Sequence, residues 1–155
     1  MRAKLLRWLE NLALETFHFS MGTLITATVL LDRHLANSNE LPSNLQLLGC
    51  VVLLIASKLT ERQIVAPECY LTASCNIFTE ERLMEKEREV FDQIKWQEVR
   101  NGALKSVRTG CKKLGLKMKL PLAETILFTL MRDEELRTES PSRLACICLA
   151  LLRMN

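Results

Sequence analysis

The strongest constraint on the fold is residues 47–56 (LLGCVVLLIA), an unbroken apolar run that Lys58 follows two residues later. In helical spacing Leu47, Val51 and Leu54 lie on one stripe, and Lys58 continues that stripe. A helix that is apolar on most of its sides has to be covered by other elements, so we expect a central helix wrapped by its neighbours. The run is shorter than the roughly 20 residues that cross a bilayer, and no contact with a membrane is expected.

A second apolar stripe also carries a charge. Leu83, Glu87, Val90 or Phe91, and Ile94 follow helical spacing, with a carboxylate in the middle of the apolar stripe. Because Lys and Glu are rarely fully buried unless they are paired, Lys58 and Glu87 predict a surface that meets another protein. In the alternative interpretation, Lys58 interacts with the dipole of its own helix C-terminus and Glu87 pairs with a neighbouring base.

The composition favours an all-α fold. The 155 residues are 48% hydrophobic but only 5% aromatic, with 5 glycines and 4 prolines, whereas strand-rich chains depend on aromatic residues and frequent turns. We expect five helices in a first domain, residues 1–96, and about three in a second, residues 97–155. The expected helices cover 2–15, 21–36, a long apolar stretch opened by 43–46, 67–74, 79–96, 99–114, 121–132 and 142–153.

Three sequence signals mark helix starts. Ser20 is an expected N-cap. Ser43-Asn44-Leu45-Gln46 has the pattern of a capping box. Thr79 is followed by Glu80 and Glu81, which place acidic side chains in a positive first turn.

The cysteines indicate the cellular compartment, and the charge indicates which classes of partner to expect. The six cysteines form no CxxC pair, and no secretory leader is recognised, so we expect a reduced compartment, the nucleus or the cytoplasm. The net charge of +3 is too small to indicate nucleic-acid binding by itself. Residues 100–119 are basic without an acid, which is interpreted as a solvated helix face, with an anionic partner as the alternative.

No pattern of catalytic residues is present. Phosphate-binding glycine loops, zinc-protease motifs and nucleophile elbows are missing. His18 and His34 are isolated in the sequence and are interpreted as surface or packing residues. We therefore expect no enzyme activity, no catalytic residue, no metal and no cofactor.

Five short motifs, in this order and at these separations, resemble the five-helix box of the cyclin family. They are Met1-Arg2-Ala3 with Trp8-Leu9, Leu31-Asp32-Arg33-His34-Leu35, Leu45-Gln46-Leu47-Leu48-Gly49, Ile55-Ala56-Ser57-Lys58-Leu59 with Glu61, and the helix from Thr79 to Ile94-Lys95-Trp96. The resemblance covers residues 1–96. More faintly, Leu136, Pro141-Ser142 and Ala145 resemble part of the second cyclin box, which here stops after about three helices. The loop lengths are most similar to those of D-type cyclins and their viral relatives.

The resemblance implies roles for the two misplaced charges. In cyclins, the lysine and the glutamate at the positions of Lys58 and Glu87 reach the partner kinase beside its αC helix. Arg2 and Asp32 resemble a structural ion pair between the first two helices, and Leu47 resembles a framework position.

The resemblance also implies a docking patch for Arg-x-Leu peptides of substrates or inhibitors. Its matching positions are Met1, Leu5, Trp8 and Gln46. Lys4 stands where the family has an apolar residue and Asn11 where an acid often receives the peptide arginine, so the patch departs from the family pattern. A lysine beside an arginine ligand repels it.

The function implied is that of a regulatory subunit that binds and activates a cyclin-dependent kinase in the cell cycle. Two alternatives stay open. One is a cyclin-fold scaffold or a DNA-binding transcription factor, as in transcription factor IIB and retinoblastoma-type pockets, in which the basic stretch contacts phosphates. The other is a truncated cyclin that binds a kinase without activating it.

Overall fold

The structure is a computed structural model that describes residues 1–94 and 102–154, and no strand occurs among them. The chain forms two compact units, Met1–Ile94 and Lys95–Asn155. The expected all-α fold is therefore confirmed. The expected domain boundary after residue 96 lies outside the described residues, as do Lys95 and Trp96, and it stays a prediction.

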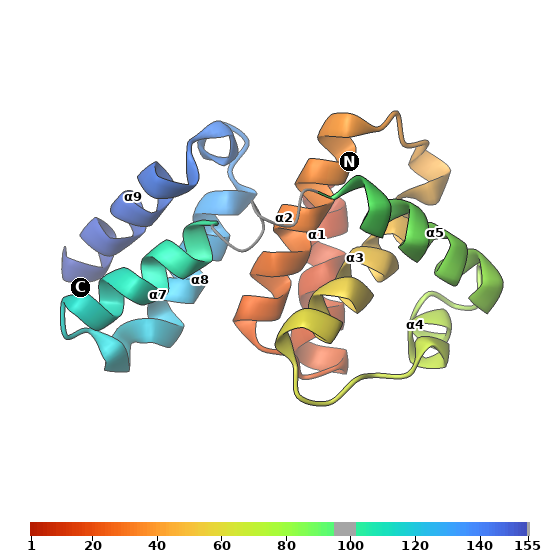
Figure 1. The fold of residues 1–155 in the computed structure, drawn as a ribbon, viewed down its shortest axis with the longest axis horizontal. Coiled ribbons are helices and arrows are strands. Elements are labelled where there is room, and N and C mark those ends of the chain that lie inside the picture. The colour runs from red at the N-terminus through yellow and green to blue at the C-terminus, as the bar shows by residue number, and fades with distance from the viewer. Residues whose placement is uncertain (95–101, 155) are drawn as a thin grey trace. The chain divides into compact units, whose positions relative to one another are not determined.

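The first unit holds the five expected helices with two short turns between them (Figure 1). In chain order they are α1 (Arg2–Glu10), the π-helical turn η1 (Asn11–Thr16), α2 (Met21–Asn37), the 3-10 turn η2 (Pro42–Asn44), α3 (Leu45–Thr60), α4 (Pro67–Ala73) and α5 (Glu80–Gln93).

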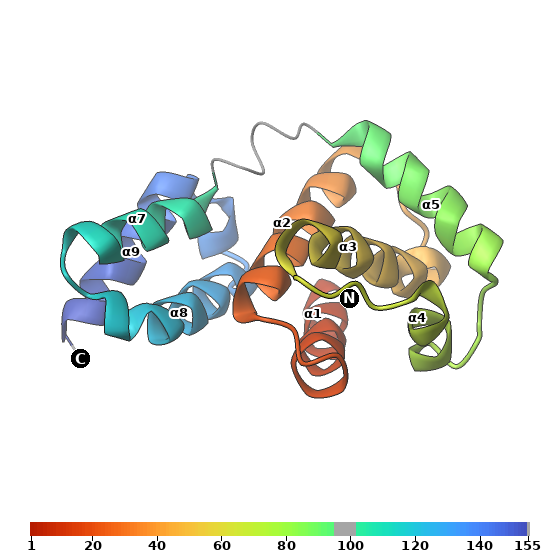
Figure 2. The same cartoon turned by 60° about the horizontal axis from the view of Figure 1, so that its bottom comes forward.

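Helix α3 is the centre of this unit. Every residue from Leu47 to Ser57 is buried, and the helix runs between α1 and α2 on one side and α4 and α5 on the other (Figures 1 and 2). By length and composition alone, the helical stretch of residues 42–60 could cross a membrane. Most of this stretch, however, is buried inside the unit. This burial is that of a core helix, as the apolar run predicts.

Two of the three expected caps form. The Ser20 side chain accepts a hydrogen bond from the Thr23 backbone N–H at 3.3 Å, and the Thr79 side chain accepts one from Arg82 at 3.3 Å. The capping box at Ser43–Gln46 is wrong. Pro42 instead opens a 3-10 turn that includes Ser43. Asn44 is therefore the residue before α3; it makes no side-chain cap, and its amide donates to Glu40 Oε1 at 3.0 Å.

The expected helix over 2–15 changes to π-helical geometry after Glu10. In the π turn the Phe17 N–H bonds the Leu12 carbonyl at 3.0 Å, and Phe17 then packs on Tyr70 with the ring centroids 4.7 Å apart. The wider turn thus directs an aromatic side chain onto α4.

The carboxylate of Glu61, just after α3, caps the N-terminus of α2. Its Oε1 accepts hydrogen bonds from the Ser20 N–H at 2.8 Å, the Ser20 hydroxyl at 3.0 Å and the Thr23 hydroxyl. Burial raises the pKa of Glu61, but these hydrogen bonds lower it by more, and its pKa is below the usual value. A negative charge at a helix N-terminus also interacts favourably with the helix dipole.

In its described residues, 102–154, the second unit contains three helices and two 3-10 turns. They are α7 (Ala103–Lys113), η3 (Lys117–Lys119), α8 (Leu120–Arg132), η4 (Leu136–Thr138) and α9 (Pro141–Met154). Gly115 ends the first of these with φ +72°, a conformation that glycine adopts without strain. Leu127, Phe128, Leu144 and Leu152 are buried between the helices. Apolar side chains also stay exposed on this unit: Leu114, Met118, Leu122, Leu151 and Met154.

We predict that Glu61→Gln lowers the free energy of unfolding by about 1–2 kcal/mol, because it removes the charge from hydrogen bonds at the α2 N-terminus. Chemical denaturation followed by circular dichroism measures this effect. Glu15→Gln, at an exposed position of the same unit, is the control and should leave stability unchanged. Equal stability of the Glu61 variant and the control would contradict the capping role.

Candidate functional site

The structure brings Lys58 and Glu87 together. Lys58 Nζ lies 2.6 Å from Glu87 Oε1, and this ion pair joins the last turn of α3 to the middle of α5. The Lys58 side chain is 39% exposed and that of Glu87 is 15% exposed, so the pair borders solvent. The two charges that break the apolar stripes are thus one surface feature.

The residue before Lys58 links α3 to α4 through buried hydroxyl groups. The Ser57 hydroxyl, one residue before Lys58, donates to the Leu54 carbonyl at 2.8 Å and lies 3.2 Å from the Tyr70 hydroxyl. Burial raises the pKa of Tyr70 to about 12, although the Ser57 contact lowers it. Ser57 and Tyr70 thus link the C-terminal part of α3 to α4.

Exposed apolar side chains flank the ion pair in the sequence. Leu59 follows Lys58 and is 52% exposed, and Phe91, four residues after Glu87, is 50% exposed. Residues four apart lie on one side of a helix, so Phe91 is next to Glu87 on α5. A charge pair with large apolar neighbours has the composition of a protein interface.

The predicted framework residues are also placed together. Arg2 Nε and Nη2 donate to the two carboxylate oxygens of Asp32 at 2.6 and 2.8 Å, which ties the start of α1 to α2. Such two-bond pairs are among the stronger hydrogen-bonded contacts. Leu47 is buried near the start of α3.

The predicted docking residues divide between surface and core. Met1 is 78% exposed, Trp8 is half-buried and Leu5 is buried. Trp8 and Leu5 lie against Gly49, where a Cβ atom would come within 3.0 Å of the Trp8 ring, so α1 approaches α3 closely there. Gln46 is half-buried in the first turn of α3.

Residues 1–98 match the family "Cyclin, N-terminal domain". The chain belongs to the cyclin family. It is 30% identical over its whole length to Cyclin-A1-2 of Arabidopsis thaliana, of which it covers 30%. It is 29% identical to G2/mitotic-specific cyclin-B3 of Caenorhabditis elegans, over 97% of this chain and 39% of the relative.

A solved structure is similar over most of the chain. The crystal structure of a viral cyclin from herpesvirus saimiri matches with a TM-score of 0.77 at 24% identity, over 97% of this chain and 66% of that one. This similarity shows the cyclin fold. The chain spans about a third of the length of the two cyclins named above. Because these matches include A-type, B-type and viral cyclins, the closer similarity to D-type cyclins stays a prediction.

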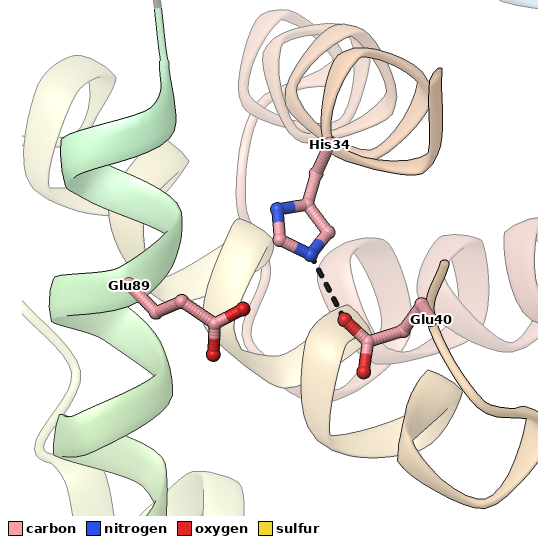
Figure 3. Close-up of side chains that lie close together, drawn as sticks. All are labelled: His34, Glu40 and Glu89. Atoms are coloured by element: carbon pink, nitrogen blue, oxygen red, sulfur yellow. Dashed lines mark hydrogen bonds and ion pairs between the residues drawn. The ribbon is translucent and has the colours of Figure 1, made fainter. Parts of the chain in front are cut away.

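A second charged cluster was not expected from the sequence. Figure 3 shows His34 of α2, Glu40 and Glu89 of α5 converging, with His34 Nε2 2.9 Å from Glu40 Oε2. The ammonium group of Lys86 lies 2.5 Å from Glu40 Oε2 and 2.9 Å from Glu89 Oε1. His34, Glu40 and Lys86 are almost completely buried, whereas Glu89 is half-exposed.

This cluster has the ligand types of a metal site, because one donor atom from each of His34, Glu40 and Glu89 lies within 4.8 Å of the others. The cation between the two carboxylates is the Lys86 ammonium, and we assign no metal to the cluster. His34 Nδ1 is buried without a hydrogen-bond partner. We therefore place the imidazole proton on Nε2, from which it is donated to Glu40, because an unpaired buried N–H costs free energy.

The pKa values of Glu40 and Lys86 are both shifted in the direction that favours their charged forms. Burial raises the pKa of Glu40, but hydrogen bonds from Lys86, His34 and Asn44 outweigh it and lower the pKa to about 2. Burial lowers the pKa of Lys86, and the contacts with Glu40 and Glu89 raise it by more, to above its usual value. At neutral pH the pair is thus a charged, buried ion pair.

We predict that ionised Glu40 makes stability depend on acid pH. Because its folded pKa is depressed, its contribution is present above the usual carboxyl pKa of 4.5 and is lost as pH falls toward 2. Denaturation of the wild type and Glu40→Gln between pH 6 and pH 2.5 should give a difference in unfolding free energy that shrinks from at most about 3 kcal/mol toward zero.

Glu15→Gln is the control for this pH series, since its carboxylate is exposed. Its stability profile should run parallel to that of the wild type. A parallel profile for Glu40→Gln as well would contradict the ionised, hydrogen-bonded state of Glu40.

Proposed function

We propose that this protein is a regulatory subunit that binds and activates a cyclin-dependent Ser/Thr protein kinase and thereby regulates cell-cycle progression. The observation that supports the proposal is the surface ion pair of Lys58 and Glu87. By their resemblance to the cyclin motifs, these two residues correspond to the lysine and the glutamate that reach the kinase. A regulatory subunit of this kind has no catalytic residues of its own and binds no cofactor.

The proposed mechanism is a shift between two states of the kinase. A protein kinase is competent for phosphoryl transfer when the lysine of its strand β3 pairs with the glutamate of its αC helix. A partner that binds the inward position of αC better than the outward one favours the active state by that difference in affinity. Here α3 and α5 would pack against αC.

The two charges would supply orientation. Lys58 and Glu87 can donate and accept charge-assisted hydrogen bonds, which are stronger than neutral ones and more demanding in geometry. The exposed side chains of Leu59 and Phe91 would supply apolar contact area beside them. An interface with an apolar centre and few directed polar contacts is typical of a specific complex.

We predict that Lys58→Ala and Glu87→Ala each weaken kinase binding by roughly 30-fold or more, because truncating one member of a buried interfacial charge pair costs at least about 2 kcal/mol. Kinase activation should fall in parallel. Stability should change by less than about 1 kcal/mol, since the pair borders solvent in the free protein. Titration calorimetry and a histone-type kinase assay with a panel of monomeric cyclin-dependent kinases measure both effects.

Arg82→Ala is the matched control. It removes a cation from an exposed position of α5, where Arg82 pairs with the exposed Glu85 at 3.5 Å. Binding and activation by this variant should equal those of the wild type. Normal activation by Lys58→Ala and Glu87→Ala would refute the assigned contact site.

The same assay separates the other candidate functions. Binding without stimulation would identify a cyclin-fold protein that sequesters its kinase. A folded sample that neither binds nor stimulates any kinase would favour the scaffold or DNA-binding role, for which the second unit offers the exposed Lys112, Lys113 and Lys117. DNA affinity would then fall steeply with salt concentration.

Arg-x-Leu peptides of substrates or inhibitors are a further proposed ligand, with Met1, Leu5, Trp8 and Gln46 as the contact residues. The exposed apolar side chain of Met1 and the half-buried Trp8 support it, whereas the exposed Lys4 next to them repels the arginine. We also propose residence in the nucleus, the cytoplasm or both, where such kinases act.

A further inference from the structure

Helix α5 is held in the first unit by few side chains. Of the residues from Glu80 to Gln93, those buried are Leu83, Lys86 and Val90. Leu83 and Val90 are completely buried, and α5 packs on α3. A lysine is thus the third buried contact of the helix, and it directly precedes Glu87.

Lys86 and Glu87 lie on opposite flanks of the apolar line formed by Leu83 and Val90. At 3.6 residues per turn, successive residues are about 100° apart, which places Lys86 about 60° to one side of Leu83 and Glu87 about 40° to the other. Two apolar contacts on nearly the same line fix the axis of a helix but resist rotation about that axis weakly. A third contact to one side of the line opposes this rotation.

The third contact is a network that is itself well anchored. Lys86 Nζ lies 2.5 Å from Glu40 Oε2, and Glu40 also receives hydrogen bonds from His34 Nε2 at 2.9 Å and from Asn44 Nδ2 at 3.0 Å. His34 comes from α2, and Asn44 is the last residue of η2. The ammonium group is therefore fixed to two other elements of the unit.

The buried charges make this contact specific in direction. An ammonium group without its partner is costly to bury, so Lys86 stays buried only where it reaches Glu40. If α5 rotated so that Glu87 moved away from Lys58, Lys86 would also leave Glu40. The Lys86–Glu40 pair on one flank thus maintains the Glu87–Lys58 pair on the other.

We propose that the buried Lys86–Glu40 ion pair, supported by His34, Asn44 and Glu89, fixes the rotation of α5 and is the positioning group for Glu87 at the kinase-binding surface. This inference rests on the proposed kinase-binding function. Lys86 and Glu40 act through Glu87 and need not touch the kinase.

A double-mutant cycle on kinase affinity tests the proposal. Lys86→Met keeps the apolar stem and removes the charge, and it should weaken binding roughly tenfold in the wild-type background, a size common for residues of one network. In the Glu87→Ala background the same change should weaken binding less than twofold, because the group that Lys86 positions has been removed. A purely structural role of Lys86 would give the same loss in both backgrounds.

Arg82→Met is the matched control, because it removes an equal charge from an exposed position of the same helix. It should leave affinity unchanged in both backgrounds. In the free protein, amide hydrogen exchange of α5 should be faster in Lys86→Met than in Arg82→Met, and this readout needs no kinase. Unchanged exchange would overturn the positioning role.

The outcomes separate the two proposals. A folded wild-type protein that binds no kinase would overturn the proposed function and with it the kinase role of Lys86. Kinase binding by the wild type with equal losses in both backgrounds would overturn the positioning role alone. If Lys86→Met does not fold, Glu89→Gln provides the same cycle with a smaller expected loss, because it removes only the half-exposed partner of Lys86.

Discussion

The first unit depends on the complete burial of α3. From Leu47 to Ser57 the helix has no exposed side, and each fully buried Leu, Val or Ile contributes about 1.5–3 kcal/mol of hydrophobic stabilisation. A helix of this kind has no place for a charge along its length. Charged side chains therefore lie near its two ends. Glu40 precedes the helix and accepts a hydrogen bond from the Asn44 amide, and Lys58 and Glu61 lie at and just after its C-terminus. The buried helix thus determines where charged side chains can lie on the unit. The proposed partner can contact such side chains only near the ends of α3.

The sequence predicted the features that depend on neighbouring residues. The apolar run located α3, and Ser20 and Thr79 located two helix starts, because helical spacing and capping are local properties. The capping box failed because Ser43 lies inside the 3-10 turn that Pro42 opens, so it is not the residue directly before α3. The π turn after Glu10 places Phe17 on Tyr70, a contact between residues distant in the sequence that the local pattern does not reveal.

The candidate site was predicted in part for the same reason. Lys58 and Glu87 each disturb a local pattern, which made them visible, but their pairing joins residues 29 positions apart. No sequence pattern indicated that Lys86 and Glu40 form a buried ion pair. Lys86 is one of several charges in an acidic and basic helix, and Glu40 precedes a 3-10 turn, so only the folded chain shows that they meet.

The buried pair of Lys86 and Glu40 is not explained by stability alone. Replacing a buried ion pair by apolar residues of similar size is often neutral or stabilising, because two charges lose their hydration. What apolar residues do not supply is a fixed direction, since hydrophobic contacts tolerate sliding and rotation. A charged group is well suited to a helix whose next residue has to face outward at a defined angle.

The Lys58–Glu87 pair has a consequence for selectivity. In the free protein each charge already has a partner at 2.6 Å, so a ligand that offers one charge of its own must compete with an existing bond. A ligand that presents a donor and an acceptor at matching positions can engage both groups together and keep them neutralised. The pair therefore makes binding selective. A ligand with a single charge gains little binding free energy from it, whereas a surface with complementary donor and acceptor groups gains from both residues at once.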